Sequence, residues 1–408
     1  MNKGVKEIMI KIAVMGYGTI GSGVVQVIET NQDSLCKKIG EGLEVKYILD
    51  LRDFEGDPIQ SKVVHDYQII ADDPEVAVVV ESMGGVEPAC TFVKAMLEAG
   101  KSVTTSNKAL VAAHGAELIA IAKQKNVNFM FEASVGGGIP IIRALNSCLT
   151  ADRIEEISGI VNGTTNYMMT RMAEEGCDFE EVLKDAQEKG YAEKDPTADI
   201  EGHDAGRKIA ILTSLIAGQQ VDFEDVYTEG ISKITAADIL YAKQMGRVIK
   251  LLATSKQAGD TYTVMVAPFL LPKEHPLYTV NGVFNAVFVR GNMLGDAMFY
   301  GSGAGSLPTA SAVVADVVEL AKHIGKHIEL EWRPQKLEIA DYKQQSARFF
   351  VRAKAEPSAV EKVFGAVTYI DVPQLNEEVG FITSELKEAD FEQKAAELGS
   401  VIQRIRFH

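Results

Sequence analysis

The order of apolar runs in the first third of the chain constrains its fold more than any other feature of the sequence. Short apolar runs alternate with stretches of helical periodicity, for example Pro88 to Ala99. This alternation predicts an α/β domain in which helices cover both faces of a parallel sheet. The expected strands are residues 11–15, 44–49, 76–80, 101–105 and 127–131.

A glycine-rich sequence follows the first expected strand: Gly16-Tyr17-Gly18-Thr19-Ile20-Gly21. Its position between a buried strand and an amphipathic helix is the context that a dinucleotide-binding turn requires. Gly16 permits the tight turn, Gly18 lets the backbone approach a pyrophosphate, and Gly21 permits close helix–strand packing. Thr19 and Ile20 begin a helix whose N-terminus offers N–H groups to phosphates. The motif predicts a Rossmann-type domain; a glycine turn without a ligand is the weaker alternative.

Two charged residues after the second expected strand bear on which nicotinamide dinucleotide is bound. Asp50 is placed to accept a hydrogen bond from the ribose 2′-hydroxyl of NAD. Arg52 is placed to meet the 2′-phosphate of NADP instead. Either side chain could also be solvated, so the sequence leaves NAD and NADP as alternatives.

The remaining chain predicts a different architecture. Residues 133–305 indicate an α+β region with helices at 178–189 and 203–217. Its expected strands are residues 154–161, 262–271, 285–290 and 293–300, the last two joined by the two-residue turn Gly291-Asn292. A helix at 309–323 is expected to pack back on the first domain, which then comprises residues 1–132 and about 306–330. Residues 331–345 are expected to form a polar connector.

The last part of the chain, residues 346–408, predicts the order strand, helix, strand, strand, helix, strand. The pieces are residues 348–353, 358–364, 367–372, 379–384, 391–398 and 401–407. This order is typical of a ferredoxin-like βαββαβ domain.

Composition limits the possible partners. The formal net charge of -16 disfavours nucleic acid and anionic membrane surfaces. No stretch approaches the roughly 20 apolar residues of a membrane helix. The four cysteines show no CxxC spacing, which disfavours a disulfide framework or a zinc site. We expect a cytoplasmic protein with a small-molecule ligand.

The run from Gly190 to Lys208 is unusually rich in ionisable residues. Asp204 and Lys208 are four residues apart in an expected helix and therefore share a face. A lysine beside carboxylates can donate and accept protons, and carboxylates can bind a substrate ammonium. Without further context, a surface salt bridge is the favoured interpretation.

Six stretches, in order along the chain, resemble the homoserine dehydrogenase family. They are the glycine-rich turn, Glu81-Ser82-Met83-Gly84-Gly85, residues 104–110 (TTSNKAL), 132–140 (EASVGGGIP), 160–167 (IVNGTTNY) and 190–208. The resemblance implies the reversible NAD(P)-dependent reduction of L-aspartate 4-semialdehyde to L-homoserine, a step toward threonine, methionine and isoleucine.

The resemblance also implies residue roles. Lys208 would move the proton of the substrate hydroxyl, and Asp204 would orient Lys208 or share substrate binding. Glu193 would accept hydrogen bonds from the substrate amino group. Asp199 would hold the substrate or its lysine, and Gly190 would belong to the same substrate site.

On the cofactor side, the resemblance places Lys108 near the reacting carbon and the nicotinamide. Ser82, Thr105 and Gly303 would line the cofactor. The hydride leaves the carbinol carbon as the hydroxyl proton leaves, so one cationic donor must stabilise the developing oxyanion.

A structural sodium ion is a further implication of the resemblance. Glu132 and the carbonyl groups of Val135, Gly137 and Ile139 would bind it, a hard-ligand set for a hard cation. From the residues alone, a glycine-rich turn whose carbonyl groups face water is the preferred alternative.

The resemblance makes residues 133–305 a catalytic and dimerisation domain, in a homodimer or homotetramer. The C-terminal domain is similar to an ACT domain, a module that binds amino-acid effectors near a D-K-P-G-like turn. The corresponding sequence, Lys354-Ala355-Glu356-Pro357-Ser358, lacks the aspartate and the glycine. We expect weak or altered regulation, with a purely structural or dimerising role as the alternative.

Two other functions would require different residues. A phosphorylating semialdehyde dehydrogenase needs a cysteine nucleophile beside a base, and none of the four cysteines has that setting. A non-catalytic nucleotide-sensing regulator would need the glycine-rich turn, but it would not need Glu193, Asp204 and Lys208 together.

Overall fold

The computed structural model describes residues 9–408, which form two compact units. The first unit contains the described chain up to Ala151 together with Ser214–Asp222 and Gly301–Leu337. The second unit contains Asp152–Thr213, Phe223–Tyr300 and Glu338–His408. The division into nucleotide-binding, catalytic and C-terminal domains stays a prediction.

The first unit contains a six-stranded sheet in which all neighbouring strands are parallel. In spatial order the strands are β3 (Val63–Val64), β2 (Gly42–Leu49), β1 (Met9–Met15), β4 (Val76–Glu81), β5 (Ser102–Thr105) and β6 (Phe129–Met130). The order 3-2-1-4-5-6 is that of a Rossmann fold. The expected Rossmann-type sheet is therefore confirmed.

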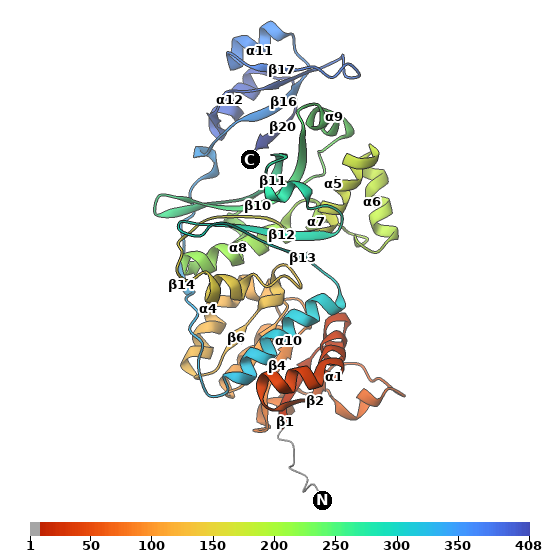
Figure 1. The fold of residues 1–408 in the computed structure, drawn as a ribbon, viewed down its shortest axis with the longest axis vertical. Coiled ribbons are helices and arrows are strands. Elements are labelled where there is room, and N and C mark those ends of the chain that lie inside the picture. Colours follow the sequence, from red (N-terminus) through yellow and green to blue (C-terminus); the bar gives the residue numbers. More distant parts are fainter. Residues whose placement is uncertain (1–8) are drawn as a thin grey trace, which may run out of the picture. The chain divides into compact units, whose positions relative to one another are not determined.

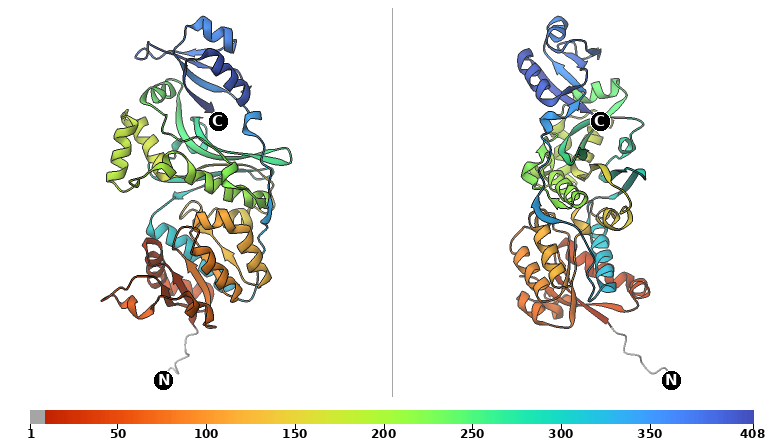
Figure 2. Two further views of the ribbon diagram at one scale, coloured as in Figure 1. Left: turned by 180° about the vertical axis from the view of Figure 1, so that it is seen from behind. Right: turned by 90° about the vertical axis from the view of Figure 1, so that its left-hand side faces the viewer.

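Helices cover both faces of this sheet. α1 (Thr19–Ile39) and α10 (Ser306–Lys322) lie side by side on one face (Figure 1). α3 (Ala89–Glu98) and α4 (Lys108–Gln124) lie on the other face, as the right-hand view of Figure 2 shows. α10 contributes Val313 and Val317 to a core shared with α1 and the sheet, so the expected return of this helix to the first domain is confirmed.

The expected polar connector contains a buried tryptophan. Trp332 is only 4% exposed, and its Nε1 donates a hydrogen bond to Oε1 of Gln220 at 3.0 Å. A Cβ atom on Gly115 of α4 would lie 3.0 Å from the indole ring, so a glycine is needed there. The next residues form β14 (Arg333–Lys336), which pairs with β8 (Gln219–Gln220). This part of the connector is thus built into the first unit.

The second unit is organised around a sheet of ten strands. Its central strands are β12 (Phe284–Gly291), β7 (Ile154–Ile160), β10 (Arg247–Ala258) and β11 (Thr261–Pro272), with β13 (Gly295–Ser302) at one edge and β9 (Tyr227–Thr228) paired to β11. The long strand β10 was not among the expected strands.

The turn between β12 and β13 differs from the expected two-residue hairpin. Three residues, Asn292 to Leu294, join the strands. The carboxylate of Asp152 accepts hydrogen bonds from the backbone N–H groups of Met293 and Leu294, at 2.9 and 2.7 Å. The prediction was wrong because a side chain distant in sequence binds the N–H groups of this turn.

Five α-helices precede the C-terminal segment, between β7 and β10 along the chain. They are α5 (Gly163–Glu175), α6 (Phe179–Glu188), α7 (Thr197–Ile200), α8 (His203–Ala217) and α9 (Ala236–Gln244). The helices expected at 178–189 and 203–217 are confirmed as α6 and α8. Within residues 9–408, no helix is long and apolar enough to span a bilayer.

The C-terminal segment has the expected βαββαβ order. It consists of β16 (Phe349–Ala353), α11 (Pro357–Phe364), β17 (Thr368–Ile370), β18 (Val379–Ile382), α12 (Glu388–Leu398) and β20 (Val401–Phe407). The spatial order β20-β16-β18-β17 and the antiparallel pairing are those of a ferredoxin-like sheet. β20 also pairs in parallel with β11, with Arg406 opposite Phe269. The C-terminal strands thus continue the sheet of the second unit (Figure 1).

Candidate active site

The glycine-rich turn has the backbone geometry that the motif predicts. Gly16 has a φ of 93°, and a Cβ atom there would lie 3.1 Å from the backbone of Ser82. A Cβ atom on Gly21 would lie 1.9 Å from the carbonyl oxygen of Gly16, so no side chain fits. Gly18 precedes α1 and has no atom within 4 Å of its Cβ position. The turn therefore leaves open space beside Gly18, where a pyrophosphate would approach the start of α1 at Thr19 and Ile20.

The carboxyl ends of the neighbouring strands β4 and β5 lie next to this turn in the sheet order. The Ser82 hydroxyl donates a hydrogen bond to the carbonyl oxygen of Gly16 at 2.9 Å and thereby holds the turn. The Thr105 hydroxyl donates to the buried carboxylate of Glu81 and accepts from the N–H of Asn107. Both hydroxyl groups brace the backbone at the edge where a dinucleotide would lie.

Lys108 and Gly303 also lie in the first unit. Lys108 is the half-buried first residue of α4, directly after β5 and the N-cap residue Asn107. Gly303 lies in the loop before α10, and its carbonyl oxygen is 2.5 Å from the Cβ position of Gly137. The loop before α10 and the turn at Gly137 are therefore in close backbone contact.

Asp50 and Arg52 form an ion pair beside the glycine-rich turn. Nε and Nη2 of Arg52 each donate to the Asp50 carboxylate at 2.9 Å, and the N–H of Tyr17 donates to the same group at 2.9 Å. The hydrogen bonds from Arg52 hold the pKa of Asp50 well below its ordinary value. The Asp50 side chain is 9% exposed, whereas that of Arg52 is 60% exposed. The Asp50 carboxylate thus already accepts hydrogen bonds from Arg52 and Tyr17, whereas the guanidinium of Arg52 is accessible to solvent.

The residues expected to bind sodium form a buried turn. Both carboxylate oxygens of Glu132 accept backbone hydrogen bonds, from Ile142 and Arg143 at 2.8 Å each. Burial raises the pKa of Glu132. Val135, Gly137 and Ile139 are buried as well, whereas Gly138 and Pro140 of the same turn are exposed. Among the hydrogen bonds of residues 9–408, none reaches the carbonyl oxygens of Val135 or Gly137.

In the second unit, Lys208 lies at the centre of a buried polar cluster. Its Nζ donates to Oδ2 of Asp204 and to the carbonyl oxygen of Val161, at 2.7 Å each. Lys208 and Asp204 are 9% and 5% exposed. The alternative of a surface salt bridge is therefore wrong. A buried lysine of this kind is held rigidly and is in contact with both a carboxylate and a neutral oxygen.

Asn162, which the sequence analysis quoted in a motif without a role, joins the carboxylates of this cluster. Its Nδ2 donates to Oδ2 of Asp204 at 2.9 Å and to Oδ1 of Asp199 at 2.7 Å. Its Oδ1 accepts from the N–H of Thr165 and so caps α5. No helix was expected at residues 163–175, and the available signal was an asparagine directly after the expected strand 154–161, since asparagine is a common N-cap residue.

Gly190 and Glu193 lie on the loop between α6 and α7. Gly190 has a φ of 73° at the end of α6. The Thr164 hydroxyl of α5 donates to the carbonyl oxygen of Tyr191 at 2.5 Å and ties this loop to the helix that Asn162 caps. The side chain of Glu193 is exposed, and the hydrogen bonds described above do not join it to Lys208.

A dinucleotide turn at the switch point of a parallel sheet and a buried lysine–carboxylate cluster together define a nicotinamide-dependent oxidoreductase. A family model described as homoserine dehydrogenase, NAD binding domain, matches residues 16–132, and one described as homoserine dehydrogenase matches residues 140–318. The chain belongs to the homoserine dehydrogenase family.

Curated relatives and solved structures agree with this assignment. The chain is 46% identical to homoserine dehydrogenase of Bacillus subtilis over 320 residues, which covers 77% of this chain and 73% of that protein. A crystal structure of a homoserine dehydrogenase from Thiobacillus denitrificans superposes with a TM-score of 0.91 at 34% identity, covering 98% of both chains. A hyperthermophilic archaeal homoserine dehydrogenase in complex with NADPH superposes with a TM-score of 0.64 at 28% identity, covering 77% of this chain and 98% of that one.

The contacts of Asn162 lead to a first testable prediction. Asn162→Ala and Asn162→Ser should each lower kcat/KM for homoserine about tenfold or more, because a hydrogen bond to a buried charged group contributes about 1.5–3 kcal/mol. Both variants lose the hydrogen bonds to Asp199 and Asp204, but a serine at the N-cap still accepts a hydrogen bond from the helix, so the alanine variant should be about 1 kcal/mol less stable than the serine variant. Steady-state kinetics and chemical unfolding measure the two effects. Unchanged kcat/KM in the serine variant would contradict this role.

Proposed function

We propose that the chain interconverts L-aspartate 4-semialdehyde and L-homoserine, with Lys208 as the proton donor and acceptor. The observation that carries this proposal is the position of Lys208, whose Nζ is 2.7 Å from both Asp204 and the carbonyl oxygen of Val161. A bound nicotinamide cofactor supplies or accepts the hydride. In the reductive direction the aldehyde oxygen gains a proton from Nζ, and in the oxidative direction Nζ takes the hydroxyl proton.

The carboxylates around Lys208 have distinct tasks in this proposal. Asp204 keeps Nζ oriented through its 2.7 Å hydrogen bond. Asp199 and Glu193 supply negative charge for the substrate ammonium, and Gly190 gives their loop its sharp turn. Lys108, at the positive end of α4, adds a cation at the edge where the nicotinamide ring is expected.

Absorbance at the reduced-nicotinamide band tests the reaction directly. Purified protein with L-homoserine should reduce NADP or NAD in a homoserine-dependent manner. Binding of both cofactors without any turnover would instead support the nucleotide-sensing regulator.

We further propose that NADP is the preferred cofactor. The Asp50 carboxylate is occupied by Arg52 and by the N–H of Tyr17, whereas the Arg52 guanidinium is 60% exposed. A ribose 2′-hydroxyl would have to compete for Asp50, but a 2′-phosphate can pair with Arg52 directly.

Arg52→Met should therefore raise the KM for NADPH about tenfold or more and leave the KM for NADH nearly unchanged. Lys37→Met, which removes an exposed cation from α1, serves as the control and should change neither value. Initial rates with both reduced cofactors measure the effect. An equal rise in the KM for NADH and for NADPH would show that Arg52 supports the glycine-rich turn and does not bind the 2′-phosphate.

A monovalent cation of the sodium type belongs to the same proposal. Val135 and Gly137 are buried residues whose carbonyl oxygens accept no hydrogen bond within the described structure, and a hard cation would satisfy them. Ile139 and Glu132 would complete the set, although each carboxylate oxygen of Glu132 already accepts one N–H.

The remaining parts of the proposal concern assembly and regulation. A homodimer or homotetramer is supported by the exposed Met298 and Tyr300 on the edge strand β13. An amino-acid effector would bind weakly at residues 354–358, which lack the aspartate and glycine of the ACT-like turn. A cytoplasmic location is supported by four unpaired cysteines.

A further inference from the structure

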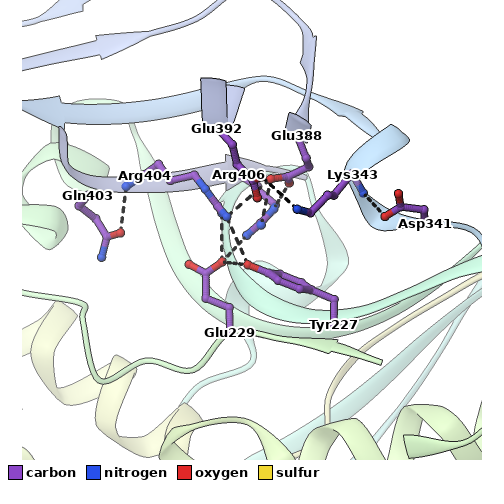
Figure 3. A network of polar contacts seen from close by, with 9 residues as sticks. All are labelled: Tyr227, Glu229, Asp341, Lys343, Glu388, Glu392, Gln403, Arg404 and Arg406. Atoms are coloured by element: carbon purple, nitrogen blue, oxygen red, sulfur yellow. Dashed lines mark hydrogen bonds and ion pairs between the residues drawn. The ribbon is translucent and has the colours of Figure 1, made fainter. Parts of the chain in front are cut away.

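Two arginines of the C-terminal strand β20 converge on a single carboxylate of the second unit (Figure 3). Nη1 of Arg404 and Nη1 of Arg406 donate to Oε2 of Glu229, at 3.0 and 2.8 Å. Burial alone would raise the pKa of Glu229, but the charges of Arg406 and Arg404 lower it. Glu229 is therefore ionised and held from the C-terminal strand.

The aromatic residue beside Glu229 is held from the same side. The hydroxyl of Tyr227 lies 3.1 Å from Oε2 of Glu229 and accepts from Nη2 of Arg404 at 3.3 Å. The ring of Tyr227 stacks on Tyr342 with 3.8 Å between the centroids. The chain from Tyr227 to Ile231, here named the bracing segment, is thus fixed by residues of the C-terminal part.

The bracing segment contacts the end of α7 through its backbone. The N–H of Ile231 donates to the carbonyl oxygen of Ile200 at 2.8 Å. A Cβ atom on Gly230 would lie 2.1 Å from the same oxygen, so the two backbones touch. The N–H of Glu229 donates to Val266 of β11 at 2.8 Å, which anchors the segment on the sheet. A displacement of the bracing segment must therefore displace α7.

α7 carries Asp199, which precedes Ile200. Oδ1 of Asp199 accepts from Asn162 at 2.7 Å, and Asn162 also donates to Asp204, the partner of Lys208. A continuous path of hydrogen bonds and backbone contacts thus runs from β20 to the cluster of Lys208, entirely within the second unit.

We infer that Arg404 is a positioning residue for the substrate site, because it holds Glu229 and, through the bracing segment, sets the place of Asp199. This inference rests on the proposed role of Asp199 in substrate binding. The C-terminal strand then contributes to recognition of the substrate without touching it. Arg404 is the suitable residue to vary, since its side chain is 16% exposed, whereas that of Arg406 is 1% exposed.

Arg404→Met should raise the KM for L-homoserine about threefold to tenfold, with kcat and the Kd of NADPH changed less than about twofold. Arg404→Lys keeps the positive charge, so its KM for L-homoserine should be close to that of the unaltered chain. Arg348→Met, at an exposed arginine that forms no ion pair within residues 9–408, is the matched control and should leave the KM unchanged. A general loss of folding would instead move the Kd of NADPH and the unfolding midpoint. If Arg404→Met does not fold, Glu229→Gln tests the same contact and should raise the KM in the same range.

A double-mutant cycle with Asp199→Asn tests the route through α7. If Arg404 acts through Asp199, adding Arg404→Met to Asp199→Asn should raise the KM by less than about twofold. The inference would be overturned if the two substitutions raised the KM independently, so that their fold-changes multiply in the double variant. It would also be overturned if Arg404→Met and Glu229→Gln both had a normal KM while Asp199→Asn had a raised one. A normal KM in Asp199→Asn itself would refute the proposed substrate role of Asp199 and, with it, the premise of the inference.

Discussion

Replacing Lys208 by alanine should lower kcat at least about a hundredfold, the usual contribution of a general acid–base group. The physical reason is that Nζ of Lys208 is the proposed source of the proton. Its removal also takes away the hydrogen bond that Nζ donates to the buried carboxylate of Asp204. The Kd of NADPH should change little, because Lys208 lies in the second unit and the glycine-rich turn lies in the first. Stopped-flow or steady-state absorbance and a fluorescence titration with NADPH measure the two quantities.

Two further variants sharpen this test. Lys208→Arg keeps the charge but does not release a proton near neutral pH, so its kcat should be nearly as low as that of the alanine variant. Lys184→Ala, at a side chain that is 78% exposed on α6, should have normal activity. Near-normal turnover in Lys208→Ala would refute the proton role.

Arg406→Met should lower the free energy of unfolding by about 3–5 kcal/mol, which is the usual effect of breaking a buried ion pair. Arg406 is 1% exposed and bridges Glu388, also 1% exposed, and Glu229. Without the guanidinium, the carboxylate of Glu388 would stay buried close to Glu229. Chemical denaturation followed by far-ultraviolet circular dichroism measures the change.

The double variant Arg406→Met/Glu388→Leu separates two causes of this loss. One is the loss of the contacts that Arg406 makes, and the other is the cost of burying the Glu388 carboxylate without Arg406. Because it removes the two most buried charges of the network and leaves Glu229 paired with Arg404, it should recover a large part of the lost stability. Arg348→Met, at an exposed arginine, should have nearly the unfolding midpoint of the unaltered chain. An unchanged midpoint in Arg406→Met would show that the network contributes no net stability.

The parts of the fold that were predictable depend on local sequence. The turn from Gly16 to Gly21 was predictable because a positive φ and a 1.9 Å approach to a backbone oxygen both require glycine. The parallel sheet of the first unit, with helices on both faces, was predictable from the alternation of strands and helices. Asp204 and Lys208 could be placed on one helical face from their spacing alone.

The parts that were missed depend on contacts between residues distant in sequence. The hairpin turn at Asn292 is set by Asp152, and Glu229 is held by arginines about 175 residues later. Asn162 was quoted in a motif, yet its link between Asp199 and Asp204 appears only when α5, α7 and α8 are brought together. Such links have no local pattern that a single sequence can reveal.

Trp332 makes the first unit optically distinct from the second. It is the single tryptophan of the chain, and its buried indole contacts Gly115, Gln220 and Phe131, all in the first unit. Intrinsic tryptophan emission therefore reports the unfolding of the nucleotide-binding unit alone, while circular dichroism reports both units. A difference between the two transitions would measure how independently the units melt, without any added label.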